Sequence, residues 1–428
     1  MYLWFILVFP WGYFDINHIR IIEPSILISG FYLLLHNKAK IKIDSFGKSY
    51  FTLICLAGLY TFLIPLFRTS DWNNIGHRIH LFIFMVELFI VYLFVYNIFD
   101  KNKIIFNKFY VVIISLHFIL TLLYCYVGFK VQLGALIFNI SAYTQNDNIE
   151  NSFYISNGIA WSFLITNSIM LGYFSNQIKT IRNIPIIIFL LIIPILVSYF
   201  NMSRSAIVLA CLISILFLVG VLKNLLFQKS SINRNKITTA FSLVIIVILL
   251  ISVTQKNALS KNFVINNVRE SIESKDDSSP EIRYNLVIDS FNYGLSTFLL
   301  GGGIGHIDLD KSRLDDDFRF LKKNSPQNTY ASIFIELGIL GLILFVKMFY
   351  IIIKRITKYK FFDSLQFIYL KKSMIFLLFA LLCSFFILHH GERSFTVFGP
   401  FVIITALFNK YLYQLKYVIN PKYSQLPR

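Results

Sequence analysis

Residues 329–353 read TYASIFIELGILGLILFVKMFYIII, an apolar run in which only Glu336 and Lys347 carry a charge. An apolar run of about 18 residues or more is long enough to cross the roughly 30 Å hydrocarbon layer of a bilayer as one helix. Similar runs recur along the chain, for example at residues 79–99 and 104–128. The sequence therefore predicts an all-α fold, that of a polytopic helical membrane protein.

The composition excludes a water-soluble protein. Of the 428 residues, 56% are hydrophobic and 14% are charged, and the mean hydropathy is +0.66, whereas soluble domains have about 25% charged residues. The net charge of +18 would suggest nucleic-acid binding in a soluble chain. Here the basic residues follow the loops between apolar runs, so we expect no nucleic-acid partner.

The cysteines do not indicate a disulfide framework or a zinc site. They lie at distant positions within separate apolar runs and have no paired spacing. The four are Cys55, Cys125, Cys211 and Cys383. We interpret them as small core side chains, and no cofactor or metal is predicted from them.

Twelve transmembrane helices account for the apolar runs. We place them at residues 1–14, 21–36, 50–67, 79–99, 104–128, 153–174, 184–200, 205–222, 237–254, 329–353, 373–388 and 395–413. The loops on one side, with the C-terminal tail, contain 22 Lys and Arg residues, and the short loops on the other side contain six. Because short basic loops stay in the cytoplasm, both termini are predicted to be cytoplasmic.

This topology places one long segment, residues 255–328, on the outer side of the membrane. Residues 1–254 before it contain the predicted helices 1–9, and residues 329–428 after it contain helices 10–12 and the tail. From Ile282 onward its apolar residues keep helical spacing. They are Ile282, Leu286, Val287, Phe291, Leu295 and Phe298. We expect an amphipathic helix that lies on the membrane face or on the spans.

The amphipathic stretch runs into LLGGGIGHIDLD, residues 299–310. This segment lacks the spacing of a dinucleotide-binding fingerprint and the Gly-Lys-Ser/Thr ending of a Walker loop. A metal site on His306, Asp308 and Asp310 stays open as an alternative, although the spacing is a weak signal. The favoured interpretation is a turn that ends a helix, in which glycines supply positive φ. A bare backbone that lets a bulky ligand approach, at Gly303 and Gly305, is the other alternative.

Three arginines are predicted at the outer membrane boundary: Arg204 in a hairpin between two spans, Arg283 in the amphipathic helix, and Arg393 in a short turn. Each could simply extend its guanidinium to water or lipid headgroups. Together they suggest a clamp for the phosphates of a lipid head, because guanidinium groups bind phosphate oxygens in a bidentate way.

Several of these motifs together resemble the O-antigen polymerase and O-antigen ligase superfamily of bacterial envelopes. The motifs are SRSA around Arg204, RYNLVIDSFNYG from Arg283 to Gly294, LLGGGIG, and SPQNTYASIFIELGILGLILF. The resemblance covers about 150 residues and implies inverting glycosyl transfer on the periplasmic face of the inner membrane. It implies a donor glycan linked to undecaprenyl pyrophosphate, which Arg204 and Arg283 would hold. A chain-length regulator and a flippase of the same pathway would be its partners.

The residues before the tenth span separate two activities within that superfamily. Ligases of the family have His-Asn there, whereas this chain has Gln327 and Asn328. Glutamine cannot accept a proton at physiological pH, so it could only orient an acceptor by hydrogen bonding. The departure favours a repeat-unit polymerase for O-antigen or capsule over a ligase. The catalytic base stays open among His306, Glu392 and Glu336, and Gln327, Asn328, Gly303 and Gly305 are predicted substrate contacts.

A transporter, such as a flippase for lipid-linked oligosaccharides, is the alternative from a different class. Transporters often contain internal repeats and charges buried in mid-span. Here the predicted charges gather on one outer face with a long loop above it, which favours an enzyme.

Overall fold

The structure is a computed structural model that describes part of the chain. The described residues are 15–16, 19–20, 26, 28, 30–33, 35, 41–67, 75–98, 157–175, 184–200, 204–227, 279–297, 299–305, 316–318, 320–321, 328–359, 365–386 and 397–419. They divide between two compact units, one formed by Met1–Ile113 with Ile282–Arg428 and the other by Ile114–Glu281.

The first unit is built on five long helices: α3 (Ser45–Phe67), α4 (Ile75–Ile98), α15 (Thr329–Lys358), α16 (Leu365–Phe385) and α17 (Phe398–Ile419). The main contacts join α15 to α3, α4 to α17, α3 to α4, and α16 to α17. Aromatic rings fill the space between them. Phe345 and Phe349 of α15, for example, contact Phe385 of α16 with ring centroids 5.4 and 5.9 Å apart.

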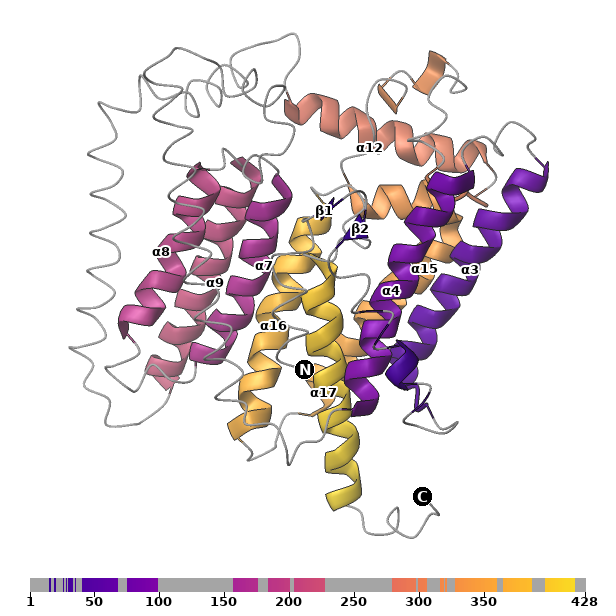
Figure 1. The fold of residues 1–428 in the computed structure, drawn as a ribbon. Coiled ribbons are helices and arrows are strands. Elements are labelled where there is room, and N and C mark those ends of the chain that lie inside the picture. The colour runs from indigo at the N-terminus through magenta and orange to yellow at the C-terminus, as the bar shows by residue number, and fades with distance from the viewer. Residues whose placement is uncertain are drawn as a thin grey trace. The chain divides into compact units, whose positions relative to one another are not determined.

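A sixth helix, α12 (Ser279–Ser296), crosses this bundle at the end where α15 begins (Figure 1). The second unit contains α7 (Asn157–Phe174), α8 (Ile184–Phe200) and α9 (Arg204–Phe227), which pack on one another. Within it the side-chain amide of Asn167 donates to the carbonyl of Leu190 at 2.8 Å and ties α7 to α8.

Outside the α-helices, the described residues form one short β-hairpin and one 3-10 turn. Strands β1 (Asp15–Ile16) and β2 (Ile19–Arg20) pair antiparallel as a short hairpin, with Asp15 opposite Arg20. Asp316–Phe318 forms a single 3-10 turn.

The fold is that of a helical membrane protein. Among the described residues, four helical segments are long and apolar enough to cross a bilayer: Ser45–Leu63, Arg78–Asn97, Thr329–Lys358 and Phe367–Phe385. Shorter apolar helices occur at Phe163–Phe174, Pro185–Ile195 and Ala206–Gly220. The predicted spans 1–14, 104–128 and 237–254 lie outside the described residues, so the count of twelve stays a prediction.

Several helices extend beyond the predicted spans. Residues 354–372 are predicted to form a basic loop, for example, but α15 continues to Lys358 and α16 begins at Leu365. Hydropathy marks where the apolar run ends and not where the helix ends. Arg355 and Lys358 extend α15 because cations in a last helical turn interact favourably with the helix dipole.

Candidate functional site

The helix α15 is interrupted at Gly338, where φ is 65° and ψ is −165°. An interruption frees backbone groups from their usual helical partners, which is costly at membrane depth unless the protein supplies replacements. Residues 299–305, the glycine loop, supply them. The amides of Gly302 and Gly303 donate to the carbonyls of Ile335 and Glu336 at 2.7 and 2.9 Å. In the other direction, the amide of Ile339 donates to the carbonyl of Leu299 at 3.0 Å.

Glycine is required on both sides of this junction. Gly301 has φ +84°, and a Cβ there would lie 2.5 Å from the backbone nitrogen of Gly338. A Cβ on Gly338 would overlap the carbonyl oxygen of Leu299. The predicted positive φ is confirmed at Gly301, Gly303 and Gly305. In the structure the bare backbone of the glycine loop approaches a second stretch of backbone, in the middle of α15. The sequence did not indicate this partner.

Glu336 sits at the centre of the junction. Its side chain is 2% exposed, and its Oε1 atom accepts a hydrogen bond of 2.7 Å from the amide of Gly305. Glu336 therefore binds the glycine loop with its backbone carbonyl and with its carboxylate. The sequence made Glu336 a candidate for the catalytic base, and in the structure its carboxylate is bound to the glycine loop.

Asn328, a predicted substrate contact, is the N-cap of α15. Its Oδ1 atom accepts from the amide of Ala331 at 3.1 Å, and its Nδ2 atom donates to the carbonyl of Phe386 at 3.5 Å. The residue is 7% exposed. Asparagine is a preferred N-cap residue, so its position just before an apolar run is a signal for this role in the sequence. The observed contacts of Asn328 thus hold the start of α15.

The amphipathic helix packs on the first turns of α15, in agreement with the prediction that it lies on the membrane face or on the spans. Leu286 and Tyr293 of α12 form an apolar cluster with Leu321 and Ile335. Gly294 lets α12 approach closely, because a Cβ there would overlap the ring of Phe334. This contact explains the glycine of the Arg283-to-Gly294 motif.

Asp289 is a residue that sequence reasoning missed. Its Oδ2 atom accepts from the amides of Phe320 and Leu321 at 2.9 and 3.4 Å, so it fixes a short part of the segment at residues 255–328 against α12. A polar residue on the apolar face of a predicted amphipathic helix was the signal that could have found it. The bond ties together parts of the segment that lie about 30 residues apart in sequence.

The structure brings together Gly303, Gly305 and Glu336 within the first unit, through the hydrogen bonds given above. Arg283 lies in α12 of the same unit, and Arg204 is the first residue of α9 in the second unit. The side chains of both arginines fall outside the described residues, as do the predicted site residues His306, Gln327, Glu392 and Arg393. Convergence of the arginines stays a prediction.

Within the described part of the chain, no three His, Cys, Asp or Glu side chains gather as a metal site would require. Cys55, Cys211 and Cys383 are free thiols. The alternative metal site on His306, Asp308 and Asp310 lies outside the described residues.

Comparison with known proteins identifies one family. Residues 189–346 match the family model described as O-antigen ligase. The match covers more than a third of the chain, from within α8 to the middle of α15, and includes Arg204, Arg283, the glycine loop and Gly338. It supports the O-antigen ligase and polymerase superfamily, as the sequence motifs predicted. A comparison with curated proteins found no match.

Proposed function

We propose that this protein is a repeat-unit polymerase for O-antigen or capsular polysaccharide. It transfers a glycan from undecaprenyl pyrophosphate to a lipid-linked acceptor repeat, with inversion at the anomeric carbon, on the periplasmic face of the inner membrane. The observation that carries the proposal is the family match over residues 189–346. The matched region contains both outer arginines and the whole junction between the glycine loop and α15.

The chemistry requires charge neutralisation more than acid catalysis. Pyrophosphate is a good leaving group, so the protein must stabilise the negative charge that develops on it and align the acceptor hydroxyl with the anomeric carbon. Arg204 and Arg283, with Arg393, are proposed to bind the pyrophosphate. Each charge-assisted hydrogen bond contributes about 1.5 to 3 kcal/mol, so a few arginines suffice for the head group.

Glu336 is proposed to act as a positioning residue, while His306 and Glu392 remain the proposed candidates for the base. The carboxylate of Glu336 is buried and holds the amide of Gly305. His306 is the next residue in the sequence, so anchoring Gly305 fixes the point from which His306 extends. A base must reach the acceptor hydroxyl to take its proton, and the buried Glu336 is less suited to that role.

Two substitutions of Glu336 separate positioning from proton transfer. Glu336→Gln keeps an oxygen that accepts from Gly305, and we expect polymer formation close to that of the wild type. Glu336→Ala leaves the buried amide without its partner, which costs about 1–3 kcal/mol, and we expect polymer formation to fall about tenfold to a hundredfold. Rates of chain extension by purified protein measure both effects. A loss of about a hundredfold or more in the glutamine variant would instead make Glu336 the base.

A ligase is the second candidate, favoured by the description of the matching family. Gln327 at the position of the family's histidine supports the polymerase, because an uncharged amide cannot serve as a base. A ligase would pass finished polymer to lipid A core or to protein, whereas a polymerase extends the chain while it is still lipid-linked.

Deletion of the gene, followed by gel analysis of the surface polysaccharide ladder, distinguishes these activities. We expect the deletion strain to carry a single repeat unit on the lipid A core, with no longer bands. Lipid-linked polymer that is not attached to core would identify a ligase. Unpolymerised precursor trapped inside the cell would identify a flippase, and either of these results would contradict the proposal.

A further inference from the structure

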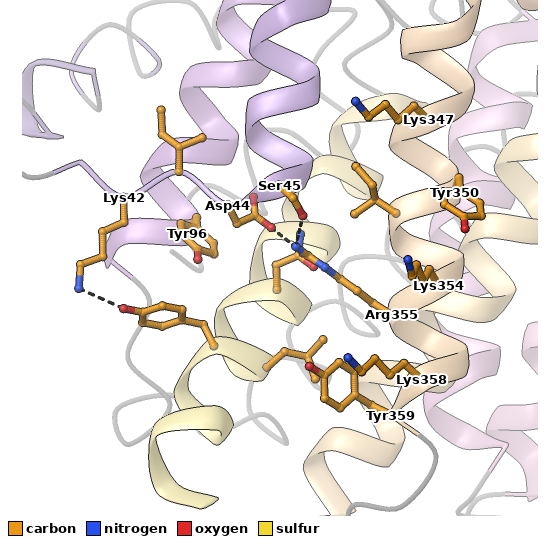
Figure 2. Close-up of a pocket in the computed structure, with 15 residues that line it drawn as sticks. Lys42, Asp44, Ser45, Tyr96, Lys347, Tyr350, Lys354, Arg355, Lys358 and Tyr359 are labelled. Carbon is orange, nitrogen blue, oxygen red and sulfur yellow. Dashed lines mark hydrogen bonds and ion pairs between the residues drawn. The ribbon is translucent and has the colours of Figure 1, made fainter. Parts of the chain in front are cut away.

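A basic pocket lies at the end of the first unit remote from the glycine loop, where α15 ends (Figure 2). Its volume is about 790 Å³. The segment before α3, the ends of α4 and α15, and α17 form its walls. Among the described residues, five cationic side chains and one acidic side chain line it: Lys42, Lys347, Lys354, Arg355, Lys358 and Asp44. By the charge pattern of the loops, this is the end predicted to face the cytoplasm.

Asp44, the acidic side chain described in the pocket, is already bound. Asp44 forms an ion pair with Arg355 at 2.5 Å, and it also accepts hydrogen bonds from the Tyr92 hydroxyl and the Gly47 amide. The other guanidinium nitrogen of Arg355 donates to the Ser45 hydroxyl at 2.6 Å. Asp44 and Arg355 therefore neutralise each other, and the remaining charge of the pocket comes from lysines.

Three lysines of α15 carry that charge. Figure 2 shows Lys347, Lys354 and Lys358 extending from α15 on its pocket side. In the described part of the chain, no acidic side chain forms an ion pair with any of these three lysines. The ammonium group of Lys354 lies 5.9 Å from the centroid of the Tyr350 ring. Like charges four residues apart, as at positions 354 and 358, destabilise a helix. The dipole of α15 favours cations only in its last turn, which does not account for Lys347.

The same face of α15 becomes apolar on the side towards the bilayer centre. Leu340 and Ile343 precede Lys347 at helical spacing and are 55% and 54% exposed. Tyr350, 58% exposed, lies between Lys347 and Lys354. Exposed aliphatic residues are followed by a tyrosine and then by lysines, which is the order in which a membrane changes from acyl chains to headgroups. A soluble anion would not need the aliphatic part.

We propose that this pocket binds an anionic phospholipid. Lys347, Lys354 and Lys358 surround its phosphodiester, and an acyl chain follows Leu340 and Ile343 along α15. Basic pockets between transmembrane helices on the cytoplasmic side bind anionic lipid headgroups, and each lysine or arginine near the membrane surface contributes about fivefold in affinity. The site is separate from the proposed glycosyl-transfer site and does not depend on it.

Lipid binding to the purified full-length protein tests the proposal. Native mass spectrometry in a neutral detergent compares phosphatidylglycerol with phosphatidylcholine, which carries no net charge. We expect the wild type to bind one phosphatidylglycerol about a hundredfold more tightly than phosphatidylcholine, because three lysines contribute. The double variant Lys347→Gln, Lys354→Gln should reduce this preference about thirtyfold, because it removes two of the three charges.

Lys48→Gln is the matched control, because Lys48 is an exposed lysine near the start of α3 that does not line the pocket. It should keep the full preference. The thermal midpoint and the phosphatidylcholine affinity of each variant report whether it is folded, and Lys358→Gln replaces the double variant if that variant does not fold. Equal binding of the two lipids by the wild type, or an unchanged preference in the folded variants, would overturn the proposal. Binding of inorganic phosphate as tight as that of phosphatidylglycerol would do the same and indicate a soluble anion.

Discussion

Alanine in place of Arg204 or Arg283 is expected to abolish chain extension and to leave single repeat units on the lipid A core. A donor that is preorganised for the leaving group is typically worth about a hundredfold to a thousandfold in rate. Each alanine also removes the charge that opposes the pyrophosphate. The measurement is the polysaccharide ladder of a deletion strain complemented with each variant at equal protein level.

The controls separate binding geometry from charge. Lysine at either position keeps the charge but not the bidentate fork, so it should restore activity only in part. Arg20→Ala removes another arginine that is predicted on the outer side, and it should leave the ladder unchanged. If both arginines bind one pyrophosphate, the double alanine variant should lose little more than either single variant. Long-chain polymer at the normal level from both single variants would refute the clamp.

A side chain at Gly338 is expected to separate the glycine loop from α15. A left-handed φ costs a residue other than glycine about 1–3 kcal/mol. In Gly338→Val the new Cβ also overlaps the carbonyl of Leu299 and lies within 2.6 Å of the Leu300 carbonyl carbon. Both obstacles are backbone atoms, which cannot rotate away. We expect the free energy of unfolding to fall by about 3 kcal/mol or more, together with loss of polymer.

Gly76→Ala is the matched control for Gly338, because it lies in a helix of the same unit and a Cβ there meets nothing within 4 Å. Alanine is the better helix former by about 1 kcal/mol, so this variant should unfold at the same temperature as the wild type or slightly higher. Thermal unfolding of the purified proteins in detergent measures both. Equal midpoints for Gly338→Val and the wild type would show that the close approach at Gly338 is not needed.

The helices of the bundle were predictable because hydropathy responds to the summed apolarity of a long segment. The span expected at residues 184–200 coincides with α8, and that expected at 329–353 begins where α15 begins. The ends were less predictable where basic residues continue a helix beyond its apolar run, as in the last turns of α15. The interruption at Gly338 has no hydropathy signal, because the residues on both sides are equally apolar.

The candidate site shows the same division. A glycine turn with positive φ was predicted from local residue types and is confirmed, because φ preferences are a property of single residues. The role of Asn328 as a cap was also local and could have been predicted. The partners of the loop could not, because the bond between Gly305 and Glu336 joins residues 31 positions apart. A local sequence pattern does not specify which buried groups form a hydrogen bond when they lie so far apart in the sequence.

The sequence by itself determined that this chain is a helical membrane protein, because the length and apolarity of its segments depend on composition and order alone. Only the tertiary structure decided that the glycine loop docks on an interrupted helix, where Glu336 holds it. It also decided that the lysines of α15 line a pocket. Hydrogen bonds and charge clusters depend on which distant segments come into contact, and that is settled by packing in three dimensions.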